Sequence, residues 1–539
     1  MVRALSIAVW LLLIILPVGS GVLFLLLTSL DAKTGVSLAA FSELLLGYES
    51  ILSSFALAVV APFVACYLAL LMAPGILRKP RLQQLLSPLL SIPHVAFAVG
   101  LMLLMSPSGW LVRLVEAVSG LFPAPPAGWP LPEKSLLTVI IVLTLKELPF
   151  LLLMISAQLK QLPVKSWLVQ AQSYGYSERQ AWWRIVTPEL LRRVTLPMAA
   201  VIIYSLSVVD IPLLVGSNTP AVLAQRVYEW TFQFAADSQI KAMAGAWVLL
   251  AMALFLLLMN SKHSVLYHRL VLGKSAGTPE RFNSDKASRY AWGVLGFLSF
   301  GVITVLALQS LASSWFYPNL WPAALSPERW QTEWSYLLEP TVHSFWLALL
   351  SAITGTIAAM VLLQRQRQKA VKSFYWPVLI ALLIPQVPLV LGWQRVLGQQ
   401  LTEGWQLWWV FWSHAVYTLP YAYLVLHGAY TSFNEQWLIR AQSLGYSARA
   451  AWWRVMLPML KQPVAIAFAV AFSVSIAQYL PTQWLGQGAT PTLTTEAVSV
   501  ASGGDWRIGS LYALLQMLLP LLVFIAVGGI RKGSYAEHS

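Results

Sequence analysis

Three ionisable side chains lie within stretches of the chain that are otherwise apolar. Lys146 and Glu147 interrupt an apolar segment near residues 136–158, and Asp210 interrupts another near 194–216. Charges in such helices are costly, so by default they indicate a polar path or a proton relay. Lys146 and Glu147 are adjacent and therefore do not face each other on a helix. Two interpretations are open, namely coupling to protons and structural pairing with other helices around a wet cavity.

These residues are only partly repeated later in the chain. Asp210 stands two residues before Pro212, and the later run Gln478-Tyr479-Leu480-Pro481 again places polar groups just before a helix-breaking proline. The Lys-Glu pair corresponds instead to Tyr417-Thr418, so proton coupling by this pair is not favoured.

A polar, Trp-rich loop occurs twice. Residues 169–188 read VQAQSYGYSERQAWWRIVTP and residues 439–458 read IRAQSLGYSARAAWWRVMLP, with 12 identities in 20 positions. We call them the first and second repeated loops. Interfacial anchoring explains some of the tryptophans. It does not explain a glycine that stands 13 residues before a proline in both copies.

Each repeated loop has the signals of a helix-turn-helix. Gly175 and Gly445 predict left-handed turns that end a first short helix. Ser177, with a glutamine three residues later, predicts a capping box, whereas Ser447 retains the cap without that partner. The aromatic and basic runs that follow are Trp182-Trp183-Arg184 and Trp452-Trp453-Arg454, and the predicted bends before the next apolar segments are at Pro188 and Pro458.

The elements that must position these residues are membrane helices. Hydrophobic residues make up 58% of the 539, charged residues only 10%, and the mean hydropathy is +0.68, which excludes a water-soluble fold. A helical span needs about 20 apolar residues. Twelve such segments occur, six in each half, near residues 5–30, 50–73, 84–105, 136–158, 194–216, 242–260, 291–313, 342–363, 374–394, 406–427, 464–485 and 510–530.

The net charge of +14 reflects topology rather than nucleic-acid binding. With a cytoplasmic amino terminus, 26 of the 35 Lys and Arg residues fall on the inner side, and both termini are cytoplasmic. The even number of spans per half predicts two parallel six-helix repeats. The predicted boundaries are residues 1–260 for the first repeat (core about 49–260), 261–290 for a cytoplasmic linker, and 291–539 for the second repeat (core about 341–530).

We predict no catalytic residue and no metal site. Cys66 is the single cysteine, which excludes a disulfide framework and a cysteine metal site. Gly273-Lys274-Ser275 resembles the end of a phosphate-binding loop, but it lacks the glycine that such a loop needs five residues earlier. We therefore expect no cofactor in this chain.

The repeated loop resembles the EAA loop of permease subunits in binding-protein-dependent ABC importers. That pattern is Glu-Ala-Ala, three residues, Gly, nine residues, a branched aliphatic, any residue, an aliphatic and Pro. Ala171, Gly175, Ile185 and Pro188 match in the first copy, and Ala441, Gly445, Val455, Leu457 and Pro458 match in the second. The family glutamate is replaced by Val169 and Ile439, so Arg184 and Arg454 are candidates for holding the partner instead.

The resemblance covers the whole chain and is closest to fused permeases such as those of some thiamine and ferric-iron importers. It implies the type I importer permease fold, a multi-pass location in the bacterial inner membrane, a periplasmic substrate-binding protein, and two copies of a separate ATPase that binds the ATP. It also implies that fifth spans line the translocation path, which makes Asp210 and Gln478 candidates for that path. Lys146 and Glu147, in the fourth span, are further candidates because they are charges within the membrane. The alternative is a 12-span carrier of the major-facilitator type, driven by an ion gradient.

Overall fold

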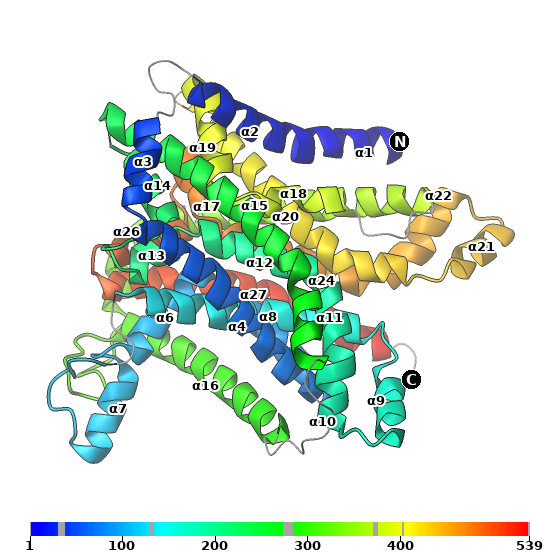
Figure 1. Cartoon of the computed structure of the whole chain (residues 1–539), viewed down its shortest axis with the longest axis horizontal. Coiled ribbons are helices and arrows are strands. Elements are labelled where there is room, and N and C mark those ends of the chain that lie inside the picture. Colours follow the sequence, from blue (N-terminus) through cyan, green and yellow to red (C-terminus); the bar gives the residue numbers. More distant parts are fainter. Residues whose placement is uncertain are drawn as a thin grey trace.

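The chain folds into long helices that lie roughly side by side (Figure 1). The computed structural model describes residues 2–30, 38–129, 134–233, 235–272, 284–369, 376–401 and 404–536. Within those ranges the β structure is one isolated bridge between Ala312 and Leu325. The predicted all-α membrane fold is confirmed. Helices suit a membrane because they satisfy their own backbone hydrogen bonds in lipid.

Twelve spans can be identified among the described residues. Eight helices are long and apolar enough to cross a membrane, and three bent pairs of helices bring the number to eleven. The twelfth is α20 (Gln406–Thr431), which has no charged residue but is less apolar because it contains Trp, Tyr and His. This number agrees with the twelve predicted segments.

Six spans belong to each half of the sequence. Those of the first half are α1–η1–α2 (Val2–Trp10, Leu11–Ile15 and Leu16–Ser29), α4 (Glu49–Arg78), α6 (His94–Met105), α8 (Leu136–Leu159), α12 (Thr195–Ser207) and α15 (Ala236–Leu272). Those of the second half are α16 (Ser284–Leu311), α17 (Glu328–Gln368), α19 (Gln386–Leu397), α20, α24 (Lys461–Ile476) and α27 (Trp506–Ala536). Both ends of the predicted linker are therefore helical, and residues 273–283 lie outside the described ranges.

One internal hydrogen bond occurs at the same place in both halves. Ser54 on α4 accepts a hydrogen bond from the backbone N–H of Leu223 at 2.7 Å, where α14 (Leu223–Thr231) begins. Ser344 on α17 accepts the same bond from Leu493 at 2.8 Å, where α26 (Leu493–Ser502) begins. The surrounding sequences, SFALA and SFWLA, also agree.

The first span of each half packs on the other half. Trp393 of α19 donates from Nε1 to the Pro17 carbonyl at 2.7 Å, which joins α2 to the second half. In the opposite direction, Trp292 of α16 donates to the Met72 carbonyl on α4 at 3.1 Å, and Gly100 of α6 leaves room for Val302 of α16. The first span of each half therefore packs against helices of the other half and holds the two halves together.

The third span of each half is broken at an Ile-Pro dipeptide. Ile92 lies between α5 (Leu86–Ser91) and α6, and Ile384 lies between α18 (Ile380–Leu383) and α19. Both isoleucines are extended, with ψ of 115° and 132°, because a residue before proline is excluded from the helical region. The bend in the second half is 95°. The breaks place His94 and Gln386, which follow the prolines, on the wall of one cavity.

Candidate functional site

The first repeated loop forms the predicted helix-turn-helix. α9 (Val164–Ser173) ends before Gly175, whose φ of +84° is the left-handed conformation that favours glycine. The Tyr176 N–H donates to the Ala171 carbonyl at 3.1 Å and closes the turn. Ser177 and Gln180 then form a complete capping box at the start of α10 (Glu178–Ala181).

The second repeated loop has the same geometry with one contact fewer. α21 (Gln436–Ser443) ends before Gly445, which has a φ of +90°. Ser447 accepts a hydrogen bond from the Ala450 N–H at 3.1 Å and begins α22 (Ala448–Ala451), without a reciprocal side chain. The predicted difference between the two caps is confirmed.

The first tryptophan of each pair anchors its loop to the second span of its own half. Trp182 is buried and donates from Nε1 to the Leu70 carbonyl on α4 at 3.2 Å. Trp452 donates to Gln364 Oε1 on α17 at 3.1 Å. Trp453 is exposed instead and contacts Trp452 edge-on. Both pairs begin a π-helical turn, η3 (Trp182–Val186) and η6 (Trp452–Met456).

Ion pairs that the sequence did not reveal make the same connection. Glu178 of α10 pairs with Arg78 at the end of α4 at 2.9 Å. Glu435, just before α21, pairs with Arg367 near the end of α17 at 3.5 Å. Arg454 lies over the ring of Tyr446 at 5.5 Å, so it stiffens its own loop. The first loop is therefore attached to α4 by Trp182 and by an ion pair. The second loop is attached to α17 by Trp452, and the Glu435 ion pair lies just ahead of it.

The bend before the fifth span lies further along the chain than the predicted prolines. It measures 66° in the first half and falls at Val194, between α11 (Thr187–Arg193) and α12. In the second half it measures 71° and falls at Leu460, between α23 (Leu457–Met459) and α24. Pro188 and Pro458 instead sit in the first turn of α11 and α23, where a missing N–H is tolerated.

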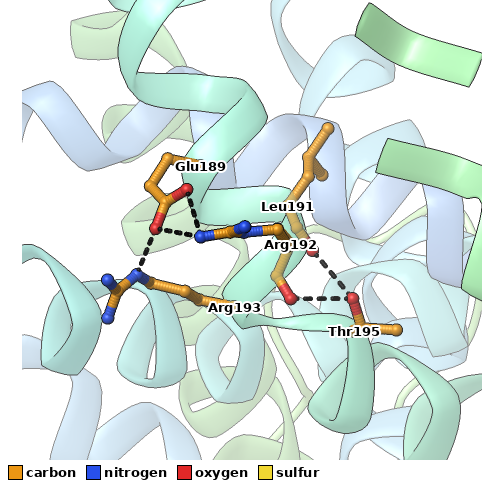
Figure 2. Close-up of polar contacts among 5 residues, drawn as sticks. All are labelled: Glu189, Leu191, Arg192, Arg193 and Thr195. Atoms are coloured by element: carbon orange, nitrogen blue, oxygen red, sulfur yellow. Dashed lines mark hydrogen bonds and ion pairs between the residues drawn. The ribbon is translucent and has the colours of Figure 1, made fainter. Parts of the chain in front are cut away.

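Glu189 organises the bend of the first half (Figure 2). Its carboxylate accepts hydrogen bonds from Arg193 Nε at 2.7 Å and from Arg192 at 3.2 Å, while Thr195 Oγ1 donates to the carbonyls of Leu191 and Arg192. Partial burial favours a higher pKa for the Glu189 carboxyl. The two arginines outweigh that effect and hold this pKa below its ordinary value.

Both repeated loops project at the same end of the molecule and expose apolar side chains there. Figure 1 shows α9–α10 and α21–α22 at that end. In the first loop Val169 is 66% exposed and Tyr174 is 83% exposed. The equivalent residues, Ile439 and Leu444, are 60% and 79% exposed. Val169 and Ile439 occupy the position at which the EAA pattern has glutamate.

The four predicted path residues line one central cavity. This cavity of about 140 Å³ lies between the halves and is bounded by Lys146, Glu147, Asp210 and Gln478. Asp210 is buried at the first residue of α13 (Asp210–Val215), and Gln478 lies in the corresponding break before α25 (Leu480–Gly486). Polar residues from distant parts of the chain thus meet in one cavity, whose other lining residues are mostly apolar or aromatic.

Polar pairs divide the cavity wall into a charged side and a neutral side. His94 Nε2 lies 2.8 Å from Glu147 Oε1, and Lys146 Nζ donates to the Leu89 carbonyl at 3.3 Å, so the neighbours face different partners as predicted. Across the cavity, Gln386 Nε2 donates to Gln478 Oε1 at 2.8 Å. All the ionisable groups named here come from the first half.

Sequence reasoning missed His94 and Gln386, although a signal was present. The matching runs IPHVAFAVG and IPQVPLVLG put the two residues at the same repeat position. Their polar character in an apolar setting pointed to the cavity. Among the described residues, no group of three His, Cys, Asp or Glu side chains lies together as metal ligands would.

Comparison with known proteins agrees with this architecture. Residues 65–271 match the family model described as the inner membrane component of binding-protein-dependent transport systems. The inner membrane ABC transporter permease protein YnjC of Escherichia coli K12 is 28% identical over 502 residues, which cover 90% of each chain.

Two further relatives match about one half of the chain. The molybdenum transport system permease protein ModB of Mycobacterium tuberculosis is 26% identical over 252 residues, covering 44% of this chain and 93% of its own length. The thiamine transport system permease protein ThiP of Salmonella typhimurium is 26% identical over 254 residues, or 40% of this chain and 47% of that protein. No solved structure matches the chain.

A relative of single-repeat length that aligns with less than half of this chain fits the two-repeat plan described above. These matches support an ABC importer permease, which is a transport protein rather than an enzyme, with the size of members that fuse two permease domains.

Proposed function

We propose that this permease moves a small solute inward through the central cavity while two copies of a separate ATP-binding subunit dock on its repeated loops. The observation that carries the proposal is the pair of exposed apolar sites, Val169 with Tyr174 and Ile439 with Leu444. Side chains of this kind are left uncovered at equivalent places on two projecting loops. Two equivalent sites favour two copies of one partner.

The attachment of the loops would transmit their movement to the helices that line the cavity. Trp182 and Glu178 tie the first loop to α4, which packs along α8. α8 carries Lys146 and Glu147 on the cavity wall. Closure of an ATPase dimer would therefore move the charged side of the cavity wall together with the first loop.

Lys146, Glu147, Asp210 and Gln478 are proposed as path residues, together with His94 and Gln386. A lining that holds charges of both signs and two amides suits a polar solute. Two of the relatives named above are described as permeases of molybdenum and thiamine transport systems, and these substances are chemically unlike each other. The proposal is therefore limited to a small polar solute delivered by a periplasmic binding protein.

The orientation and boundaries also belong to the proposal. The excess of Lys and Arg on one side, and the position of the loops at one end in Figure 1, favour cytoplasmic loops and cytoplasmic termini in a bacterial inner membrane. We keep the two repeats at 1–260 and 291–539, joined by 261–290. The ion-gradient carrier is not favoured, because the relatives named above are ABC permeases and a carrier needs no repeated docking loop.

The test is co-purification of the separately encoded ATPase with Val169→Asp and Ile439→Asp variants. Each change adds a charge without altering a buried contact, so we expect each to weaken capture and the double variant to abolish it. Leu121→Asp is the matched control, since Leu121 is also 66% exposed but lies beyond α7 (Trp110–Ser119), at the opposite end. Full ATPase capture and uptake by the double variant would overturn the proposal.

A further inference from the structure

The second half carries an apolar groove at a place where the first half is filled by side chains. It has a volume of about 700 Å³ and lies between α17, α24 and α27. Ile353 and Ile357 of α17, Phe468 of α24, and Val523 and Val527 of α27 line it. Ile353 and Ile357 are both exposed, so the groove opens on the side of α17 that faces lipid.

In the first half the corresponding space is occupied by aromatic side chains. The SFALA and SFWLA sequences place Phe63 where the second half has Ile353, and Tyr67 where it has Ile357. The Phe63 ring lies 4.6 Å from the ring of His263 on α15. Tyr67 Oη is hydrogen-bonded to His263 Nε2 at 2.8 Å. α4 and α15 thus fill their own gap.

The groove stays open because smaller aliphatic residues replace the two aromatic rings of α4. Ile353 and Ile357 of α17 stand where the first half has Phe63 and Tyr67. On α27 the groove is lined by Val523 and Val527, which are also aliphatic.

A cation lies at one end of this groove. Lys461, the first residue of α24, lines it together with Pro458 of the second repeated loop. Its counterpart in the first half is the buried Leu191. Lys461 is exposed, and no ion pair of the described residues involves it.

We propose that this groove binds a phospholipid with an anionic headgroup, from the leaflet on the side of the repeated loops. The acyl chain would lie against Ile353, Ile357 and Phe468, and the headgroup phosphate would contact Lys461. A bilayer supplies chains of this shape to any groove open on a lipid-facing surface. Lys461 at the loop end of the groove supplies a positive charge that attracts anionic lipid.

The bound lipid would support the second repeated loop. In the first half Tyr267 of α15 is buried and donates from Oη to the Trp183 carbonyl at 3.0 Å. This bond holds the first loop against α15. In the second half the groove floor behind the loop is formed by Leu457 and Pro458. A lipid there would contact the second loop directly, so we expect the position of that loop to depend on lipid.

The test is photo-crosslinking of the purified full-length protein in phosphatidylcholine vesicles. The probes carry a diazirine in the acyl chain and have either a phosphatidylglycerol or a phosphatidylcholine headgroup. We expect labelling of peptides that contain Ile353–Met360 and Val464–Phe468, with about fivefold more from the anionic probe, as one lysine near a headgroup provides. Lys461→Leu should remove that preference and leave labelling by phosphatidylcholine unchanged.

Filling the groove should remove the labelling itself. Ile353→Phe with Ile357→Tyr copies the first half, and Val527→Phe fills the space from another helix. Leu350→Phe is the control, because Leu350 is exposed on α17 but does not line the groove. Labelling that persists in both filled variants, or an equal response to both headgroups in the unmodified protein, would overturn the proposal. ATPase capture is measured separately, so failure here leaves the proposed function standing.

Discussion

Phe150 and Tyr421 occupy the same position in the two repeats and face each other beside the central cavity, with ring centroids 5.9 Å apart. Each follows a Leu-Pro pair, on α8 and α20 respectively, and both line the cavity. Two equivalent residues can meet in this way only close to the axis that relates the halves. Their edge-on contact therefore narrows the space along that axis.

Removing these two rings should make the permease leaky. We expect Phe150→Ala with Tyr421→Ala to raise the passive efflux of a small dye or ion from proteoliposomes, because the rings that narrow the cavity are gone. Phe150→Tyr keeps an aromatic pair, so this variant should show the same low efflux as the unmodified protein. Phe255→Ala is a further control, since Phe255 is exposed on the lipid side of α15. Equal efflux from all variants would show that the pair does not limit passage.

Glu147 should be important for stability because it faces His94 and adjoins Lys146. Glu147→Gln removes the charged partner of the His94 hydrogen bond, and we expect a loss of about 2 kcal/mol, as for hydrogen bonds to charged groups. Lys146→Met with Glu147→Gln should be less destabilised than the sum of the single variants. Thermal unfolding of the purified protein measures both. Strict additivity would mean that the two charges do not interact.

Asp210 and Gln478 should affect transport without affecting assembly. Asp210→Asn keeps the size of the side chain and removes its charge from the cavity, so we expect altered uptake kinetics with normal binding of the ATPase. Gln478→Leu removes the acceptor of the Gln386 hydrogen bond. It is the equivalent change in the second half, at a position that carries no charge. Uptake by Asp210→Asn that is indistinguishable from the unmodified protein would exclude Asp210 from the path.

The parts of this architecture that depend on local sequence were predictable, and those that depend on distant contacts were not. Hydropathy located the spans, and the chemistry of Gly175, Ser177 and their repeats located the turns. The crossed packing of the first spans rests on bonds such as Trp393 to Pro17, between residues 376 positions apart. The breaks at Ile92 and Ile384 were missed, because hydropathy continues across an Ile-Pro pair while the backbone does not.

The bend before the fifth span should weaken in acid. Because the pKa of Glu189 is lowered in the folded protein, its contribution to stability is present above the unfolded-state pKa of about 4.3. That contribution is lost as pH falls through the lower folded value. Hydrogen-exchange protection factors of α11 and α12, which correct for the intrinsic pH dependence of amide exchange, should therefore fall at low pH in the unmodified protein. In Glu189→Gln these protection factors should already be lower at pH 7 and should change less with pH.

Gly175 and Gly445 should control coupling through backbone conformation alone. Each has a positive φ, and a Cβ added at either position meets nothing within 4 Å, so alanine costs about 1–2 kcal/mol of local strain without a steric clash. Gly120 has a φ of +67° and equally open surroundings, but it follows α7 at the opposite end, so Gly120→Ala is a matched control. We expect Gly175→Ala with Gly445→Ala to reduce uptake per ATP hydrolysed, Gly175→Pro with Gly445→Pro to uncouple the two, and Gly120→Ala to leave the ratio unchanged. A ratio that stays constant in the double proline variant would show that the left-handed turns do not transmit the movement of the ATPase.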